Sequence, residues 1–182
     1  ERMLAATGLV MDQMPALFEG SDITGVVDKS LARRWSLPVV PVVAGGGDNA
    51  AGAVGMGVIK QGQTMLSLGT SGVIFAVSDG FTANPAAALH SFAHALPKTW
   101  HTMSVILSAA SCVDWIARLT GFASVSAALQ ALEKHQAAFN SVTFLPYLSG
   151  ERTPHNDPNA KGVFCGMNHE TCREDLLNAV LE

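Results

Sequence analysis

An acidic side chain that follows a run of glycines is the first candidate for chemistry. The sequence GGGDNAAG occupies residues 45–52, after a valine-rich segment and before a stretch of small residues. Glycine lets another group approach the backbone closely, and the start of a helix favours an ionised carboxylate. We therefore expect Asp48 to carry an ionised carboxylate beside backbone that another group can approach closely. The simpler interpretation makes Asp48 only the N-cap of the helix.

The same segment could also be a dinucleotide-binding turn, because a strand, a glycine turn and a helix are all expected there. Two features oppose this alternative. Asp48 would lie where the pyrophosphate binds, and like charges repel. An acidic residue is also expected about 20 residues further on, but residues 65–68 contain none.

A glycine-flanked turn that carries two hydroxyl groups is the second candidate. It joins two β-rich segments at residues 63–68 and 73–78, which predicts a hairpin. The residues of the turn are Gly69, Thr70, Ser71 and Gly72. Successive backbone N–H groups of such a turn can point into one concavity, which suits a phosphate group. It is not a P-loop, because no lysine follows, and a plain polar turn is the alternative.

A polar loop at residues 149–161, stiffened by prolines, is typical of a cleft edge. Its Glu151 and Arg152 could equally form a solvated ion pair. The three histidines at 90, 94 and 101 have no carboxylate among them, and we expect no metal site there.

The three cysteines predict neither a disulfide framework nor a zinc site. They are Cys112, Cys165 and Cys172, and no two of them form a CxxC pair. We expect reduced, mostly buried thiols in a cytosolic protein.

These residues need an α/β scaffold to hold them. We expect helices at residues 1–7, 26–35, 48–59, 109–119 and 125–138, and strands at 37–44, 63–68, 73–78, 100–107 and 142–148. The valines of 37–44 suit a strand buried on both faces, although its prolines favour a strand end or an edge. A capping box at residues 171–174 predicts the start of a last helix.

Composition excludes several classes of protein. The 182 residues are 48% hydrophobic and only 14% charged, with a net charge of −4 and no basic block, so nucleic acid is not an expected partner. No apolar run reaches the roughly 20 residues that cross a membrane. The low charge is typical of a fragment whose faces are covered by something else, and both ends are predicted to be cuts inside a longer polypeptide.

Taken together, the motifs resemble the FGGY family of carbohydrate kinases. The resemblance rests on GGGDNAAGAVG at 45–55, LSLGTSG at 66–72, HALP from 94 with WHTMSVILSAASCVDW from 100, and FLPYLSGERTPHNDPNAKG at 144–162. It implies part of an actin-like ATPase fold of the ribonuclease H-like type. Residues 1–60 would end the first, sugar-binding lobe and include the interdomain helix. Residues 61–182 would begin the second, nucleotide-binding lobe.

The resemblance also implies the roles of individual residues. Asp48 would be the catalytic base and would bind the sugar together with Asn49, while Gly69, Thr70, Ser71 and Gly72 would bind ATP with Mg²⁺. The implied sugar is D-xylulose, phosphorylated to D-xylulose 5-phosphate, with another ketose or polyol as the alternative. A non-catalytic, actin-like sugar-sensing protein is a further alternative.

The resemblance sets expectations for the partners as well. The family's first phosphate motif and its adenosine motif are absent from residues 1–182. We therefore expect these residues to have no kinase activity without the remaining parts of their own chain. A cytoplasmic protein is implied, with neither nucleic acid nor membrane as a partner, and a homodimer is allowed.

Overall fold

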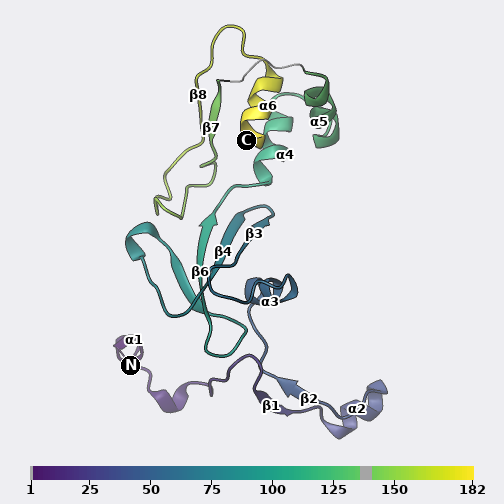
Figure 1. Cartoon of the computed structure of the whole chain (residues 1–182), viewed down its shortest axis with the longest axis vertical. Helices are drawn as coiled ribbons and strands as arrows, with labels where there is room; N and C mark the ends of the chain where they lie inside the picture. The colour runs from purple at the N-terminus through teal and green to yellow at the C-terminus, as the bar shows by residue number, and fades with distance from the viewer. Residues whose placement is uncertain (1, 136–140) are drawn as a thin grey trace. The chain divides into compact units, whose positions relative to one another are not determined.

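The computed structural model describes residues 2–135 and 141–182 (Figure 1). They fall into two units, and each is described by itself. The first unit comprises Glu1–Gly57 and Ala93–Thr99, and the second comprises Val58–Phe92 and Trp100–Glu182. Helices and strands occur in both units, so the expected α/β class is confirmed.

The first unit consists of short elements joined by long connections. They are α1 (Arg2–Thr7), a 3₁₀ turn (Met11–Gln13), β1 (Ile23–Val26), α2 (Lys29–Trp35), β2 (Pro41–Val43) and α3 (Asp48–Gly55). Helix α3 is shorter than predicted, because Gly57 adopts a positive φ of 74° two residues after the helix ends.

Helix α2 begins later than the predicted helix at residues 26–35. Val26 ends strand β1, and the carboxylate of Asp28 caps α2 by accepting hydrogen bonds from the N–H groups of Ser30 and Leu31 at 2.8 and 3.3 Å. The left-handed Ser36 ends the helix. The prediction is therefore wrong over residues 26–28, because a capping aspartate fixes the start of the helix more strongly than hydrophobic periodicity does.

Strand β2 is an edge strand, as its prolines predicted, but it is not buried. It pairs antiparallel with β1 in a two-stranded sheet. Val42 and Val43 are 44% and 52% exposed. The prediction of a strand buried on both faces is wrong for the described residues, because a two-stranded ribbon buries its faces only where another layer covers them.

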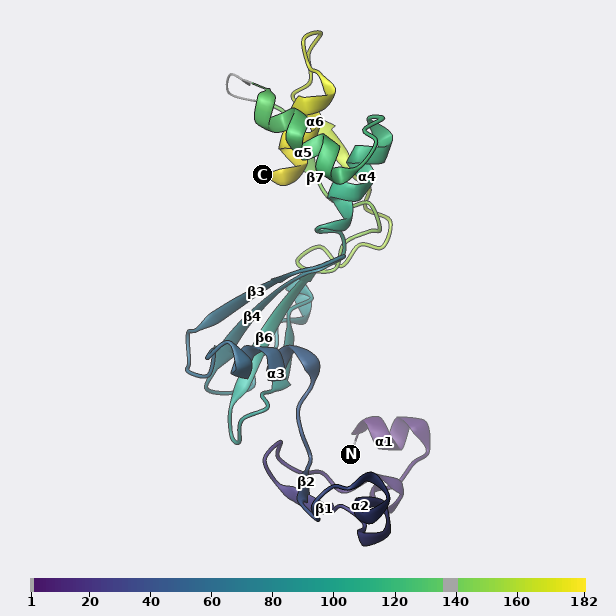
Figure 2. The ribbon, with the colours of Figure 1, turned by 90° about the vertical axis from the view of Figure 1, so that its right-hand side faces the viewer.

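The second unit contains a four-stranded sheet. Its strands are β3 (Thr64–Leu68), β4 (Gly72–Ser78), β5 (His90–Ala93) and β6 (Trp100–Ile106), in the order β3-β4-β6-β5. Strands β3, β4 and β6 pair antiparallel, and Figure 2 shows them side by side. The predicted hairpin and the predicted strand at 100–107 are confirmed. Strand β5 was not predicted, because its four residues show no clear alternation of apolar and polar side chains.

Three helices and a two-stranded sheet complete this unit. They are α4 (Ser111–Leu119), α5 (Val125–Lys134), β7 (Thr143–Leu145), β8 (Val163–Cys165) and α6 (Arg173–Leu181). The helices predicted at 109–119 and 125–138 are present, although α5 ends at Lys134, and residues 136–140 lie outside the described residues. The strand predicted at 142–148 has only three residues, and the equally short β8 was missed.

The hydrophobic core formed by these helices lies where α4, α5, α6 and β7 meet (Figure 1). Ile116 of α4 and Leu177 of α6 are fully buried beside Ala128 of α5. The rings of Trp115, Phe144 and Phe164 stack on one another, with centroids 4.6–6.2 Å apart. This aromatic stack joins α4 to the β7–β8 sheet.

Helix α6 is capped one residue later than predicted. Its N-cap is Cys172, whose N–H group donates to the Asp175 carboxylate at 2.8 Å. The hydroxyl of Thr171 instead accepts from the N–H group of Asn168 at 2.9 Å and so belongs to the preceding turn. The capping box predicted at 171–174 is therefore wrong by one residue.

None of the described helices combines the length and the apolar character that crossing a membrane requires.

Candidate functional site

Asp48 is the first residue of α3, and its carboxylate is exposed. Its Oδ1 accepts hydrogen bonds from the backbone N–H of Asn49 at 2.8 Å and from the Asn49 side-chain amide at 3.4 Å. The N-cap is Gly47, which has no capping side chain. The interpretation of Asp48 as a plain N-cap is therefore wrong. Among the described residues Oδ2 has no hydrogen-bond partner, so it is free to accept one from a ligand.

The glycine bend before Asp48 is held by its own chain. Gly45 has a positive φ of 82°, and its N–H group donates to the carbonyl of Gly20 at 2.9 Å. A Cβ at Gly46 would lie 2.6 Å from the Cβ of Ala95, so only glycine fits against the segment 93–99. At Gly46, the group that approaches the glycine backbone closely is therefore the side chain of Ala95.

The strand topology does not fit the dinucleotide alternative. A dinucleotide-binding unit requires parallel strands joined through a helix. Here β2 pairs antiparallel with β1, and β3, which follows α3, belongs to another sheet. The strands of the described residues therefore form no such unit around Asp48.

The turn at residues 69–72 is fixed to the start of α4 through its carbonyl groups. The N–H groups of Ala109 and Ala110 donate to the carbonyls of Thr70 and Gly69, both at 2.9 Å. The Ser111 hydroxyl also donates to the Thr70 carbonyl, at 2.8 Å. These hydrogen bonds use the carbonyl groups of the turn and leave the donor groups of Thr70 and Ser71 open.

The donor groups of the turn are available to a ligand. Within residues 2–135 and 141–182, the N–H and hydroxyl groups of Thr70 and Ser71 have no hydrogen-bond partner. Thr70 is exposed and Ser71 is half-buried. Two N–H groups and two hydroxyls on one turn can bind the oxygens of a phosphate group. A Cβ at Gly72 would lie 2.7 Å from the Ile106 side chain, so this glycine is needed for packing.

A largely apolar pocket of about 380 Å³ lies next to this turn. Leu68 and Ile106 line it from the sheet, Val113 from α4 and Val180 from α6. Cys112 also lines the pocket, and burial raises the pKa of its thiol, which favours the neutral form. The sequence did not reveal this pocket, because its walls come from segments far apart in the chain.

Glu151 is buried, with only 2% of its surface exposed. Its Oε1 accepts hydrogen bonds from the N–H groups of Leu107 and Arg152 at 3.2 and 2.7 Å. The interpretation of Glu151 and Arg152 as a solvated ion pair is therefore wrong. The Glu151 carboxylate instead links the polar loop to Leu107. Leu107 lies between β6 and residues 109–111, which donate hydrogen bonds to the turn at residues 69–72.

Two of the three histidines, His90 and His101, pack against aromatic rings. His101 stacks on Phe75 with centroids 4.0 Å apart, and His90 meets Phe92 edge to face. The one grouping of metal-binding side chains among the described residues lies elsewhere and contains none of these histidines.

The cysteines differ in accessibility more than predicted. Cys112 is buried, Cys172 is intermediate and Cys165 is exposed, so the expectation of mostly buried thiols holds only for Cys112. Cys165 is exposed because successive side chains alternate across β8, and its neighbour Phe164 is the residue that packs in the aromatic stack.

We expect iodoacetamide to label the exposed Cys165 first and Cys112 last. The Cys112 thiol is both inaccessible and, because burial raises its pKa, poor in thiolate, which is the reactive form. Mass spectrometry of peptides after timed labelling measures the order, and labelling in denaturant provides the control in which the difference disappears. Labelling of Cys112 as fast as Cys165 in the folded protein would contradict this expectation.

Comparison with known proteins identifies the family of this chain. Residues 1–55 match the N-terminal domain of the FGGY family of carbohydrate kinases, and residues 64–182 match its C-terminal domain. The chain belongs to the FGGY family of carbohydrate kinases.

Several individual members of this family are similar to the chain over nearly its whole length. Xylulose kinase of Escherichia coli is 59% identical over 180 residues, which are 99% of this chain and 37% of that protein. Xylulose kinase of Klebsiella pneumoniae is 59% identical over all 182 residues and 38% of its own length. A crystal structure of a xyloylose kinase from Brucella ovis has a TM-score of 0.92 at 50% identity and covers 99% of this chain and 37% of that one.

The chain thus spans a little over a third of the length of these relatives. The structural match confirms the expected fold, part of the actin-like ATPase fold of the FGGY sugar kinases.

Proposed function

We propose that the protein to which these residues belong is an ATP-dependent sugar kinase that converts D-xylulose to D-xylulose 5-phosphate. The observation that carries this proposal is the match of nearly the whole chain to xylulose kinases at 59% identity. The exposed carboxylate of Asp48 and the open donors of the turn at 69–72 support it.

The proposed roles divide between two lobes of the whole protein. Residues 1–60 would end the sugar-binding lobe, and residues 61–182 would begin the nucleotide-binding lobe. Asp48 would accept a hydrogen bond from the terminal hydroxyl of the sugar, and Asn49 would bind a neighbouring hydroxyl. Because Asn49 engages only Oδ1 of Asp48, Oδ2 is available to the substrate.

The turn would bind ATP through its phosphates. Gly69 and Gly72 shape the turn, while Thr70 and Ser71 supply N–H and hydroxyl donors that fit phosphate oxygens. ATP would supply the terminal phosphoryl group, and Mg²⁺ would neutralise the negative charge of its phosphates. The protein's own part is to orient the hydroxyl of the sugar and to take its proton late in the transfer, for which an ionised aspartate is a sufficient base.

The proposal also includes a cytoplasmic location and a site that residues 1–182 do not complete by themselves. The cysteines of the described residues are all free, which supports a reducing, cytoplasmic location. The remaining parts of the chain are needed to close the site, so residues 1–182 by themselves would transfer no phosphoryl group.

A coupled assay of ADP release by the full-length protein tests the function. We expect the highest kcat/KM with D-xylulose, and lower values with D-ribulose and glycerol, compared with a control that contains no sugar. Preference for another sugar would replace the proposed substrate within the same family. Sugar binding without ADP release from any sugar would instead support the sugar-sensing alternative.

A further inference from the structure

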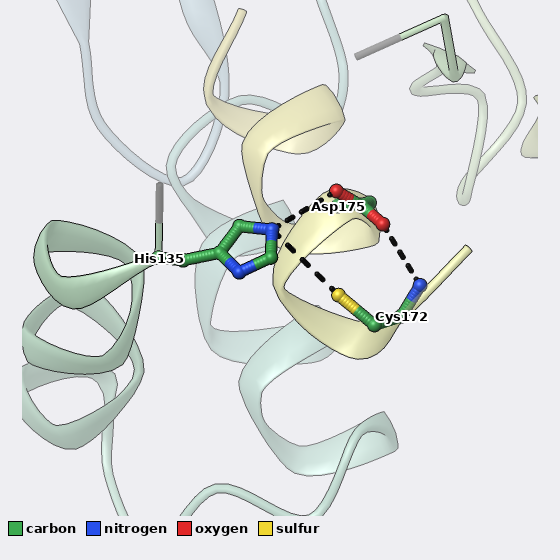
Figure 3. Close-up of side chains that lie close together, drawn as sticks. All are labelled: His135, Cys172 and Asp175. Atoms are coloured by element: carbon green, nitrogen blue, oxygen red, sulfur yellow. Dashed lines mark hydrogen bonds and ion pairs between the residues drawn. The ribbon is translucent and has the colours of Figure 1, made fainter. Parts of the chain in front are cut away.

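His135, Cys172 and Asp175 bring three metal-binding side chains together outside the proposed kinase site (Figure 3). His135 is the C-cap of α5, Cys172 is the N-cap of α6, and Asp175 lies in the first turn of α6. The Nε2 atom of His135 lies 3.2 Å from Asp175 Oδ1 and 3.8 Å from Cys172 Sγ. One ligand atom from each residue lies within 4.8 Å of the other two.

These separations are close to those around one tetrahedral ion. Zinc bonds of about 2.0–2.1 Å to nitrogen, 2.0–2.2 Å to oxygen and 2.3 Å to sulfur imply ligand separations of about 3.4 Å for N···O and 3.6 Å for S···N at tetrahedral angles. The observed values are 3.2 and 3.8 Å. An ion could therefore be bound with side-chain shifts of a few tenths of an ångström at these two edges.

The local structure already orients the ligands. The Cys172 N–H group donates to Asp175 Oδ2 at 2.8 Å, which leaves Oδ1 directed at His135 (Figure 3). Helices α5 and α6 pack through the buried Ala128 and Leu177, which fixes the two helix ends relative to each other. Such support from surrounding contacts is what a metal site requires.

The arrangement does not fit a nucleophilic triad. In a triad the carboxylate and the nucleophile contact opposite nitrogens of the imidazole ring. Here Asp175 and Cys172 both approach the same atom, Nε2 of His135 (Figure 3). Three ligand atoms within 4.8 Å of one another can instead surround a single metal ion.

We propose that His135, Cys172 and Asp175 form a zinc site that joins the end of α5 to the start of α6. A thiolate, an imidazole and a carboxylate suit zinc, and the two anionic ligands balance its charge of +2. The side chains of His135 and Asp175 are 29% and 18% exposed, so the ion reaches the site from solvent and water completes its coordination. The site was invisible in the sequence because Cys172 and His135 are 37 residues apart.

Metal titration of the full-length protein tests the proposal. The protein is first stripped with a chelator and kept free of nucleotide, so that no Mg²⁺–ATP site competes. Zn²⁺ affinity is measured by competition with a chromophoric chelator. Co²⁺ is then added as an optical probe, for which we expect a thiolate-to-cobalt charge-transfer band and the intense visible bands of four-coordinate cobalt.

Variants assign the signal to the three residues. Cys172→Ser should abolish the charge-transfer band and weaken zinc binding at least about 10-fold, the lower end for loss of even a supporting residue of a metal site. Cys165→Ser removes an exposed thiol elsewhere and should change neither. His135→Ala should weaken zinc binding as Cys172→Ser does, and circular dichroism checks that each variant is folded.

Unchanged zinc affinity and an unchanged cobalt spectrum in both Cys172→Ser and His135→Ala would overturn the proposal. So would a wild-type protein that binds no more zinc than the two variants do. Neither readout depends on kinase activity, so the zinc site and the proposed function succeed or fail separately.

Discussion

Asp48→Asn in the full-length protein should lower kcat for D-xylulose by at least about 10²-fold, the lower end for loss of a positioned acid–base group. The amide keeps the size of the side chain, and its oxygen can still accept the hydrogen bond from the Asn49 N–H group. It cannot, however, take a proton from the sugar hydroxyl. A coupled assay of ADP release over a range of sugar concentrations measures kcat and KM separately.

Stability distinguishes this role from a structural one. Because Gly47 caps α3 and Asp48 is exposed, Asp48→Asn should change the free energy of unfolding by no more than about 0.5 kcal/mol. Asp12→Asn, an exposed acid in the same unit, is the matched control and should leave kcat unchanged. A kcat of Asp48→Asn within a few-fold of the wild type would remove Asp48 from the catalytic role.

Gly150→Ala should destabilise the protein by about 2–5 kcal/mol. The φ of Gly150 is +76°, which costs a residue with a Cβ about 1–2 kcal/mol. The added Cβ would also lie 2.7 Å from the carbonyl oxygen of Pro158 and 2.9 Å from its Cα, where the backbone would have to move. Overpacking of this kind adds about 1–3 kcal/mol. Urea unfolding followed by tryptophan fluorescence measures the change.

Gly121→Ala separates the two contributions. Gly121 has the same φ of +76°, but no atom lies within 4 Å of the position that its Cβ would occupy. We expect a loss of only about 1–2 kcal/mol, from this backbone conformation alone. Equal effects of the two substitutions would show that the contact with Pro158 contributes nothing. A larger effect at Gly150 would indicate that the close approach holds the loop that carries Glu151.

Local sequence signals predicted much of the framework. The hairpin of β3 and β4 follows from two β-rich segments separated by a glycine-flanked turn, and α4 follows from apolar residues at helical spacing before Gly121. Short elements were missed or displaced. A three-residue strand such as β8 carries too few side chains to show alternation, and the start of α6 depends on which of two adjacent acids reaches back to the N-cap.

The candidate kinase residues were also found from the sequence, because each group lies within a few consecutive positions. Asp48 and Asn49 follow a run of glycines, and Thr70 and Ser71 lie between two. Only the structure shows that Asp48 and Thr70 are exposed and that the donors of Thr70 and Ser71 have no partner among the described residues. The carbonyls of the turn are satisfied by residues 109–111, about forty positions further on, and only this pairing shows that its donors remain open.

The sequence by itself therefore determined the family, the chemistry-bearing turns and most helices, since these depend on neighbouring residues. Tertiary structure alone decided that the buried Glu151 accepts a hydrogen bond from the Leu107 N–H group and that His135 meets Cys172 and Asp175. These partners are 37–44 residues apart. Side chains so far apart are brought together by the packing of whole helices and strands, and no spacing within one element records that contact.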